Sequence, residues 1–346
     1  MKKLITGSLL IILPLFALLA QETPPPEAFT PSGTPSFRVY FNYHYDFTED
    51  IPQPSVFEIK RTYFGYKYKF SENVSSRIML DVGKNSGGVA YTAYLKYAHL
   101  DWKVSSPLKI SFGLMPSKMF DDQENHWGYR YLYKSLQDEF KFGSSAEMGV
   151  NAEIKYTNQL SSDFFIMNGE GYKNLQDDFG MHMYGANLVF KSDFGLTLKA
   201  YGSINMKKQV TDTDTTAVNI INYNAFVGYK TKNFRIAAEY NEMLNGDTYK
   251  NPLEDHNRTG ITVYGTYVIN NRYEVFANFI EMSSNKINSE DQHPWNYDED
   301  GQVIIVGGQF APLKGIKFAV NYRAGLQENN IFNDNHLLYL NFEFRF

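Results

Sequence analysis

The stretch HLLYLNFEFRF (336–346) decides the fold class of this chain. Its even-numbered positions from Leu338 to Phe346 are all leucine or phenylalanine, whereas the odd-numbered positions from Tyr339 to Arg345 carry polar groups. Alternation with a period of two is typical of a β-strand that buries one face. Chain ends are usually polar and frayed unless something ties them down. We therefore predict a strand whose even-numbered face is buried against an apolar medium.

Composition indicates what that medium is. The chain has 346 residues, of which 43% are hydrophobic and 16% aromatic, yet its mean hydropathy is −0.40. A high aromatic content and a low mean hydropathy are hard to combine in a soluble globular domain. They are compatible in a transmembrane β-barrel, where lipid-facing and water-facing residues alternate along each strand. The chain has no cysteine, so a disulfide scaffold is excluded.

The first 35 residues differ from the rest of the chain. MKK followed by LITGSLLIILPLFALLA predicts a secretory signal peptide over residues 1–20. The apolar run is too short for a membrane-spanning helix, which needs about 20 apolar residues. QETPPPEAFTPSGTP (21–35) predicts a Pro-rich tether, and residues 36–346 are assigned to the barrel. Removing Lys2 and Lys3 changes the net charge of −5 to about −7, which argues against nucleic-acid binding.

Period-two alternation recurs along the whole barrel region. SFRVYFNYHYDF (36–47) and FGYKYKF (64–70) show it clearly. All such runs together predict about 16 antiparallel strands, each near the roughly 9 to 11 residues that cross a tilted path through a bilayer. Within 89–104 the apolar residues change from odd to even positions, which predicts a β-bulge.

The connections between these runs alternate between short and long. Short turns are expected at 71–73, 105–107, 157–159, 192–193, 230–233, 270–271 and 312–315. Longer polar segments are expected near 48–55, 83–88, 116–146, 169–180, 205–217, 243–258, 283–300 and 325–335. This alternation of connection lengths is typical of a barrel in the bacterial outer membrane, with tight periplasmic turns and longer external loops. The last strand must pair with the first, because an unpaired edge in lipid costs several kcal/mol per backbone group.

Several segments resemble the phosphate-selective porin (O and P type) family. They are FEIKRTYFGYKYKF (57–70), VSSRIMLDVG (74–83), LKYAHLDWKV (95–104), LKISFGLMPSKMF (108–120) and SSAEMGVNAEIKY (144–156). The resemblance implies a sixteen-stranded barrel that assembles as a homotrimer and passes small anionic solutes by passive diffusion. The chain departs from the family in lacking a dense run of arginines, which leaves the identity of the anion open. The ending with Phe342, Phe344 and Phe346 resembles the C-terminal signal that the outer-membrane insertion machinery recognises.

The longest loop, 116–146, carries the candidate site. In porins the loop after the fifth strand folds into the lumen and narrows it, so the resemblance implies the same here. Its apolar anchors would be Trp127, Tyr129, Tyr131, Tyr133 and Phe140. The candidate constriction and anion-binding residues are Lys118, Arg130, Lys134 and Lys141 from the loop and Arg61, Lys67, Arg77 and Lys109 from the strands. Alternation places more basic than acidic side chains in the lumen, and rings of charge decide pore selectivity, so anions are favoured.

Other chemistry finds little support in the sequence. The seven histidines are scattered and form no local catalytic motif, so we expect no enzyme and no cofactor. Acidic clusters at TDTDTT (211–216), NPLEDH (251–256) and NYDEDG (296–301) lack the spacing of a dedicated Ca²⁺ loop, so no metal site is predicted. They fit either solvated loop tips or external loops that bridge lipopolysaccharide through divalent ions. A barrel hydrolase and a non-conducting barrel for adhesion or assembly remain the alternatives.

Overall fold

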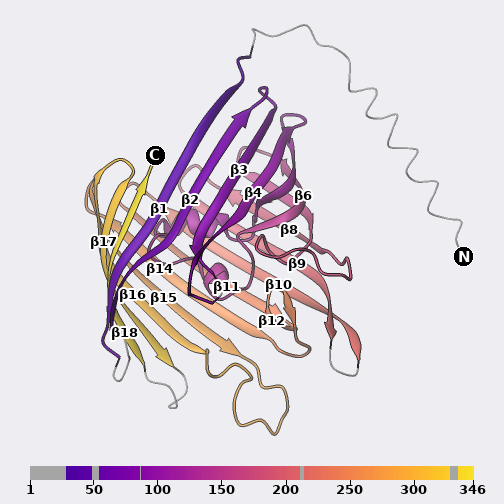
Figure 1. Cartoon of the computed structure of the whole chain (residues 1–346), viewed down its shortest axis with the longest axis vertical. Helices are drawn as coiled ribbons and strands as arrows, with labels where there is room; N and C mark the ends of the chain where they lie inside the picture. The colour runs from indigo at the N-terminus through magenta and orange to yellow at the C-terminus, as the bar shows by residue number, and fades with distance from the viewer. Residues whose placement is uncertain (1–28, 49–53, 86, 211–213, 328–333) are drawn as a thin grey trace, which may run out of the picture.

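The computed structural model describes residues 29–48, 54–85, 87–210, 214–327 and 334–346. Within them, 16 strands form one closed antiparallel barrel (Figure 1). The expected signal peptide and residues 21–28 of the expected tether lie outside the described residues. The sixteen strands are β1 (Ser32–Asp46), β2 (Ser55–Lys69), β3 (Val74–Lys84), β4 (Tyr91–Lys103), β5 (Leu108–Pro116), β6 (Ala146–Lys155), β7 (Leu160–Met167), β8 (Met183–Lys191), β9 (Leu196–Val210), β10 (Thr215–Lys230), β11 (Phe234–Leu244), β14 (Arg258–Val268), β15 (Tyr273–Ser284), β16 (Gly301–Leu313), β17 (Ile316–Gln327) and β18 (Asn335–Arg345).

The barrel closes where the first and last strands meet. β1 and β18 are antiparallel, with Arg38 opposite Arg345 and Phe41 opposite Phe342. Leu340 of β18 is 38% exposed on the outer surface, whereas Asn341 is 1% exposed. This closure confirms the prediction that the even-numbered face of the terminal strand points outward, and it leaves no edge strand in the sheet.

The outer surface of the barrel is largely apolar. Phe64, Ile236 and Val320, on three different strands, are each half exposed, and many other large apolar side chains share this surface. An apolar surface of this extent is not compatible with water and is typical of a barrel in lipid. Among the described residues, no helix is both long enough and apolar enough to cross a membrane.

Among the described residues, the barrel wall contains three register shifts, one of them between Phe310 and Leu313 of β16, and the other two are bulges in β2 and β4. In β4, Tyr97 lies opposite Met79 and Leu95 lies opposite Leu80, so Lys96 is the inserted residue, which confirms the bulge predicted within 89–104. In β2 the register shifts in the same way, and the inserted residue is Lys60. A bulge bends the strand and re-aims the side chains around it. Both bulges therefore change which residues reach the lumen.

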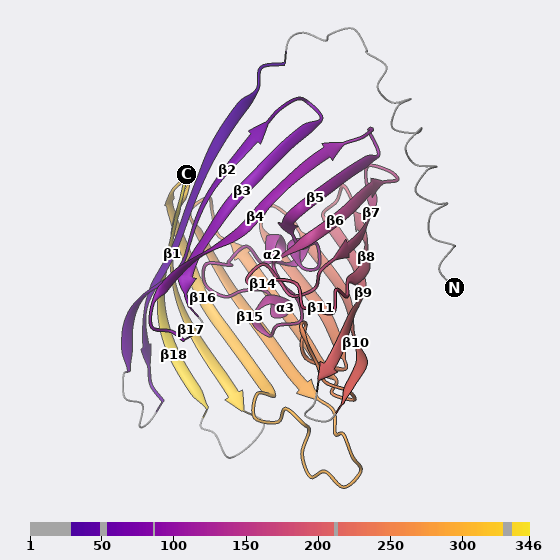
Figure 2. The same cartoon turned by 45° about the vertical axis from the view of Figure 1, so that its right-hand side comes forward.

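Short turns gather at one end of the barrel and long connections at the other (Figures 1 and 2). Two boundaries differ from the predictions. The strand β1 begins at Ser32, inside the expected tether, and pairs there with β2. The expected loop 205–217 is mostly strand, because alternation continues: Met206 points outward, whereas Lys207 is buried inside the barrel. Within the loop after β11, β12 (Gly246–Thr248) and β13 (Asn251–Pro252) form a separate two-stranded sheet.

Candidate functional site

The connection between β5 and β6 lies inside the barrel. It contains the two short helices α2 (Asp121–Trp127) and α3 (Leu136–Glu139), which Figure 2 shows within the ring of strands. Side chains of this loop form hydrogen bonds with the inner wall on β10, β11, β15 and β16, and its backbone carbonyls accept hydrogen bonds from side chains of β14 and β17. The structure thus places the longest loop across the lumen, where it narrows the passage.

Aromatic side chains attach the loop to the wall. The ring of Trp127 lies 5.2 Å from that of Tyr264 and 5.8 Å from that of Phe276, and the rings of Tyr129 and Phe276 are 4.4 Å apart. Aromatic pairs at these distances stabilise by about 0.5–1.5 kcal/mol beyond their burial. Gly128, between the two anchors, has φ of 77°, a left-handed conformation that glycine adopts without strain and that ends α2.

Buried amides form a second set of anchors. Gln123 of α2 donates to the side-chain oxygen of Asn224 at 2.8 Å. Gln137 of α3 donates to Glu239 at 2.9 Å and to the side-chain oxygen of Asn241 at 2.8 Å. Because buried polar groups are costly without partners, these bonds fix the position of each helix on the wall.

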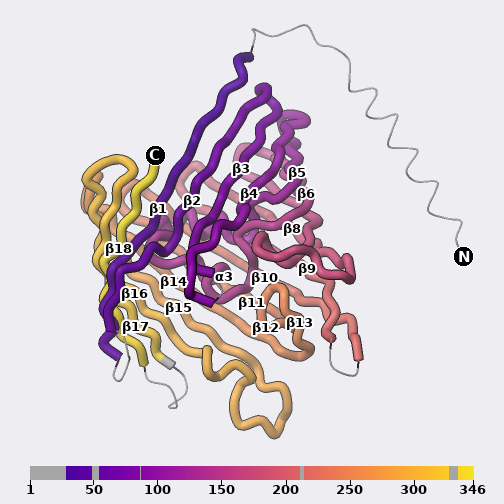
Figure 3. Tube along the Cα trace, in the orientation of Figure 1, coloured from indigo at the N-terminus to yellow at the C-terminus, as the bar shows by residue number. Residues whose placement is uncertain are grey.

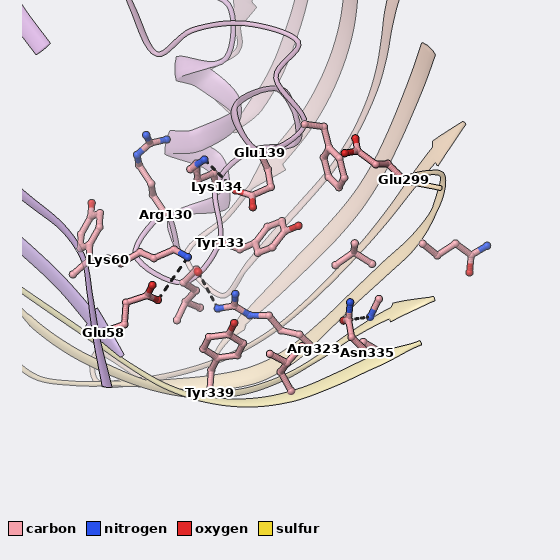
Figure 4. A pocket seen from close by; sticks show the side chains of 18 of the residues that line it. Glu58, Lys60, Arg130, Tyr133, Lys134, Glu139, Glu299, Arg323, Asn335 and Tyr339 are labelled. Atoms are coloured by element: carbon pink, nitrogen blue, oxygen red, sulfur yellow. Dashed lines mark hydrogen bonds and ion pairs between the residues drawn. The ribbon is translucent and has the colours of Figure 1, made fainter. Parts of the chain in front are cut away.

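Arg323 of β17 holds the opposite side of the loop. Its guanidinium donates to the carbonyl oxygen of Leu132 at 2.9 Å and lies 3.7 Å from the centre of the Tyr339 ring (Figure 4). The Tyr133 ring lies on the loop side of the same guanidinium, 5.4 Å away. Stacking and hydrogen bonding together fix both the arginine and the loop backbone.

Arg130 occupies the waist of the lumen. Two cavities, of about 510 and 460 Å³, include residues near the long loops, such as Glu299 and Lys173. Two others, of about 630 and 510 Å³, include residues near the short turns, such as Lys314 and Arg272. Arg130 lines all four cavities. The pair of cavities at the loop end and the pair at the turn end, which we call the two vestibules, therefore meet at this side chain.

Arg130 is paired with acidic residues of its own loop. It forms ion pairs with Glu124 and, at 2.7 Å, with Asp138. Burial disfavours the charged form of Arg130, but Asp138 together with Tyr63 and Tyr40 outweighs this effect, and the pKa of Arg130 lies well above its usual value. Burial also opposes ionisation of Asp138, but Arg130 together with Lys134 and Lys96 outweighs it and lowers the pKa of Asp138 to about 2. Both groups are therefore charged at neutral pH, and the selectivity of the waist depends on the surrounding charges as well.

Basic side chains exceed acidic ones on both sides of the waist. The two cavities at the turn end are lined by ten basic residues and four acidic residues, namely Arg38, Arg77, Lys96, Arg130, Lys230, Arg235, Arg272, Lys314, Lys317 and Arg345 against Asp121, Glu124, Glu274 and Glu343. The two cavities at the loop end are lined by nine basic and six acidic residues, namely Lys60, Arg61, Lys84, Arg130, Lys134, Lys141, Lys173, Lys250 and Arg323 against Glu58, Asp81, Asp138, Glu139, Glu299 and Asp300. The path through the barrel is therefore positive, although the whole chain is acidic.

The structure brings together some of the residues predicted as the site. Five of the eight line the cavities that meet at the waist, namely Arg61, Arg77, Arg130, Lys134 and Lys141. Two of the others, Lys109 and Lys118, lie away from it and share Glu153 at 2.5 and 3.8 Å. Lys67 lies on β2 and lines none of the cavities at the waist.

The sequence pattern did not predict several residues of the site. Lys60 and Lys96 are the inserted residues of the two bulges, so simple alternation does not assign them to the lumen. Lys60 pairs with Glu58 at 3.8 Å and, across the cavity of Figure 4, Lys134 pairs with Glu139 at 3.2 Å. The change of parity within 89–104 was the signal that could have located Lys96. The chain trace in Figure 3 shows β2 and β4 in the wall of the barrel and α3 within the barrel.

The acidic and histidine side chains of the described residues do not gather into a metal-binding cluster. Those residues contain no group of three or more histidine, aspartate or glutamate side chains that could hold a metal ion. The ring nitrogens of His99 and His126 lie 3.3 Å from the Leu114 carbonyl oxygen and 3.1 Å from the Ile236 carbonyl oxygen. Both histidines thus satisfy backbone groups within the lumen.

Comparison with known proteins supports the fold. No protein-family model and no curated protein sequence matches the chain. Among solved structures, OmpF of Salmonella typhi, in complex with daunomycin, aligns with a TM-score of 0.69 at 13% identity over 91% of this chain and 97% of its own. The outer membrane channel DcaP of Acinetobacter baumannii gives 0.67 at 12% identity over 91% and 97%. The anion-selective porin from Comamonas acidovorans gives 0.63 at 9% identity over 92% and 100%. The chain therefore has the fold of the outer-membrane porins.

Proposed function

We propose that this protein is a porin of the bacterial outer membrane, a passive diffusion channel for small hydrophilic solutes that favours anions. The observation that carries the proposal is the waist at Arg130, where cavities from both ends of the barrel meet. Loop and wall together leave a narrowed path, which is the arrangement expected of a selective pore.

The excess of basic side chains supports anion preference. Although Arg130 is paired with Glu124 and Asp138, basic residues outnumber acidic ones in both vestibules. A low-dielectric wall around a charged passage focuses the field and concentrates counter-ions in it. Anions would therefore be enriched along the whole path. The porin of Comamonas acidovorans that shares this fold is anion-selective, which agrees with this direction; a preference for phosphate itself rests on the sequence resemblance alone.

The apolar outer surface supports a location in the outer membrane, with lipid around the barrel and lipopolysaccharide around the external loops. We further propose a homotrimer, since OmpT of Vibrio cholerae, which aligns with a TM-score of 0.59 at 12% identity over 92% of this chain and 100% of its own, is described in a trimer form. Phe342, Phe344 and Phe346 would serve as the signal for the insertion machinery. In this proposal the protein carries out no catalysis.

Swelling of liposomes that contain the refolded protein tests the channel directly. In isosmotic solutions of a small sugar, the proposal predicts rapid swelling, and swelling that slows as the sugar grows larger. Liposomes that do not swell with the smallest sugar would reject the channel and favour a hydrolase or a non-conducting barrel.

A further inference from the structure

The largest of the four cavities at the waist combines charged and apolar walls. It has a volume of about 630 Å³ and lies between the loop and the inner faces of β1 to β4, at the turn end. Tyr63, Met79 and Tyr97 supply apolar surface, and Arg38 and Arg77 supply positive charge. Cavities of about 300–1,000 Å³ with apolar walls and a few placed polar groups are typical of sites for small organic molecules.

The aromatic rings hold the cations in place. The guanidinium of Arg77 lies 4.6 Å from the centre of the Tyr97 ring, and the ammonium of Lys96 lies 4.9 Å from the centre of the Tyr63 ring. Such contacts orient a cation while leaving donors free for a further partner. The cavity thus presents positive charge directly beside flat apolar surface.

Two of these cations have no acidic partner. Among the described residues, no carboxylate lies within 4.0 Å of the guanidinium nitrogens of Arg38 or Arg77, in contrast to Arg130. Arg38 donates to the hydroxyl oxygen of Tyr40 at 3.1 Å, and Arg77 donates to the sulfur of Met79 at 3.7 Å. A guanidinium has five N–H donors, so both arginines retain donors for an incoming anion.

We propose that this cavity binds aromatic carboxylates during their passage, with the carboxylate at Arg38 and Arg77 and the ring against Tyr63, Met79 and Tyr97. A small, strongly hydrated inorganic anion would use the charges but would gain nothing from the apolar wall. A planar organic anion gains from both, because arginine pairs well with carboxylates and apolar burial contributes about 25 cal/mol per Å². The proposal rests on the proposed function and refines it by naming a class of solute.

Equilibrium dialysis of the refolded protein with radiolabelled benzoate tests binding without requiring an open channel. Acetate carries the same charge without the ring and is the matched ligand. The proposal predicts that benzoate binds at least about tenfold more tightly than acetate, since tenfold corresponds to about 1.4 kcal/mol and burial of a phenyl group supplies at least that much. Arg77→Gln should weaken benzoate binding about fivefold to tenfold, because a hydrogen bond to a charged group is lost.

The control variant is Lys67→Gln. Lys67 lies opposite Arg77 in the sheet but does not line this cavity, so the variant removes the same charge from the neighbouring strand. Its benzoate affinity should change less than about twofold, because Lys67 is exposed and its charge is screened by solvent and salt. Arg77→Lys should keep the barrel folded and bind benzoate with intermediate affinity. This variant separates loss of the binding site from loss of the fold.

The outcomes distinguish this inference from the proposed function. Equal binding of benzoate and acetate, or equal effects of Arg77→Gln and Lys67→Gln, would overturn the aromatic-carboxylate site. If the same preparation showed anion-selective conductance, the proposed channel function would still be supported. Tight benzoate binding by a protein that forms no channel would support the site and reject the channel.

Discussion

Replacement of Arg130 by glutamine should weaken the anion preference of the channel by a predictable amount. The variant removes one positive charge at the point where the four cavities meet. A unit charge about 8 Å from a permeating ion contributes about 0.5 kcal/mol in water, with opposite signs for anions and cations. The difference in electrostatic free energy between a permeating anion and a permeating cation thus changes by about 1 kcal/mol. This change corresponds to a fall of about fivefold in the anion-to-cation permeability ratio.

The assay is the reversal potential of single channels under a gradient of dilute KCl, where the Debye length is long and screening is weak. Arg130→Gln also removes the basic partner of Glu124 and leaves Asp138 with Lys134 alone, at 3.9 Å, and loss of one member of a buried pair costs about 3–5 kcal/mol. Arg130→Lys is therefore the control, because it keeps the charge and should keep a selectivity close to that of the unaltered protein. Lys67→Gln removes a charge of the same sign outside the cavities at the waist. If Arg130→Gln and Lys67→Gln change the permeability ratio equally, Arg130 does not lie at the waist.

Three further predictions concern the loop and the chain end. Trp127→Ala should free the loop at a cost of about 3–5 kcal/mol, and single-channel recordings should show a larger, noisier conductance; an unchanged trace would contradict the role of Trp127 as an anchor. Burial raises the pKa of Asp138, but Arg130, Lys134 and Lys96 together lower it to about 2. Asp138 should therefore stabilise the loop at any pH above the ordinary value of about 3.9, and this stability should be lost as pH falls through about 2. Conductance should therefore stay constant from pH 7 to pH 4, whereas Asp138→Asn should alter it already at pH 7. Deletion of Phe346, which is 81% exposed, should lower the yield of inserted barrel in cells but hardly change the thermal stability of the folded protein; a normal yield would argue against the insertion signal.

The architecture was predictable because each strand has lipid on one face and water on the other, so apolar and polar residues alternate along it with a period of two. In β18, every outward position from Leu338 to Phe344 is apolar, and Asn341 and Glu343 point into the lumen. The alternation of short and long connections then predicted an outer-membrane barrel, and the cost of an unpaired strand edge in lipid predicted that the barrel closes. These signals are local, repeated many times, and independent of how distant parts of the chain meet.

The site was less predictable because it depends on contacts between distant residues. Arg323 binds the carbonyl of Leu132 across 191 positions, and nothing in either segment indicates that contact. The pairing of Arg130 with Glu124 and Asp138 forms only when the loop is folded. Alternation also fails at a bulge, and for this reason Lys96 was not among the predicted lumen residues.

The most direct test of the central claim is the reversal potential of the unaltered, refolded protein in a planar bilayer under a KCl gradient. The excess of basic side chains on both sides of Arg130 predicts open channels whose reversal potential lies toward that of chloride. A reversal potential toward that of potassium would contradict the assignment of the lumen charge, and a membrane that shows no channels would contradict the proposed function itself.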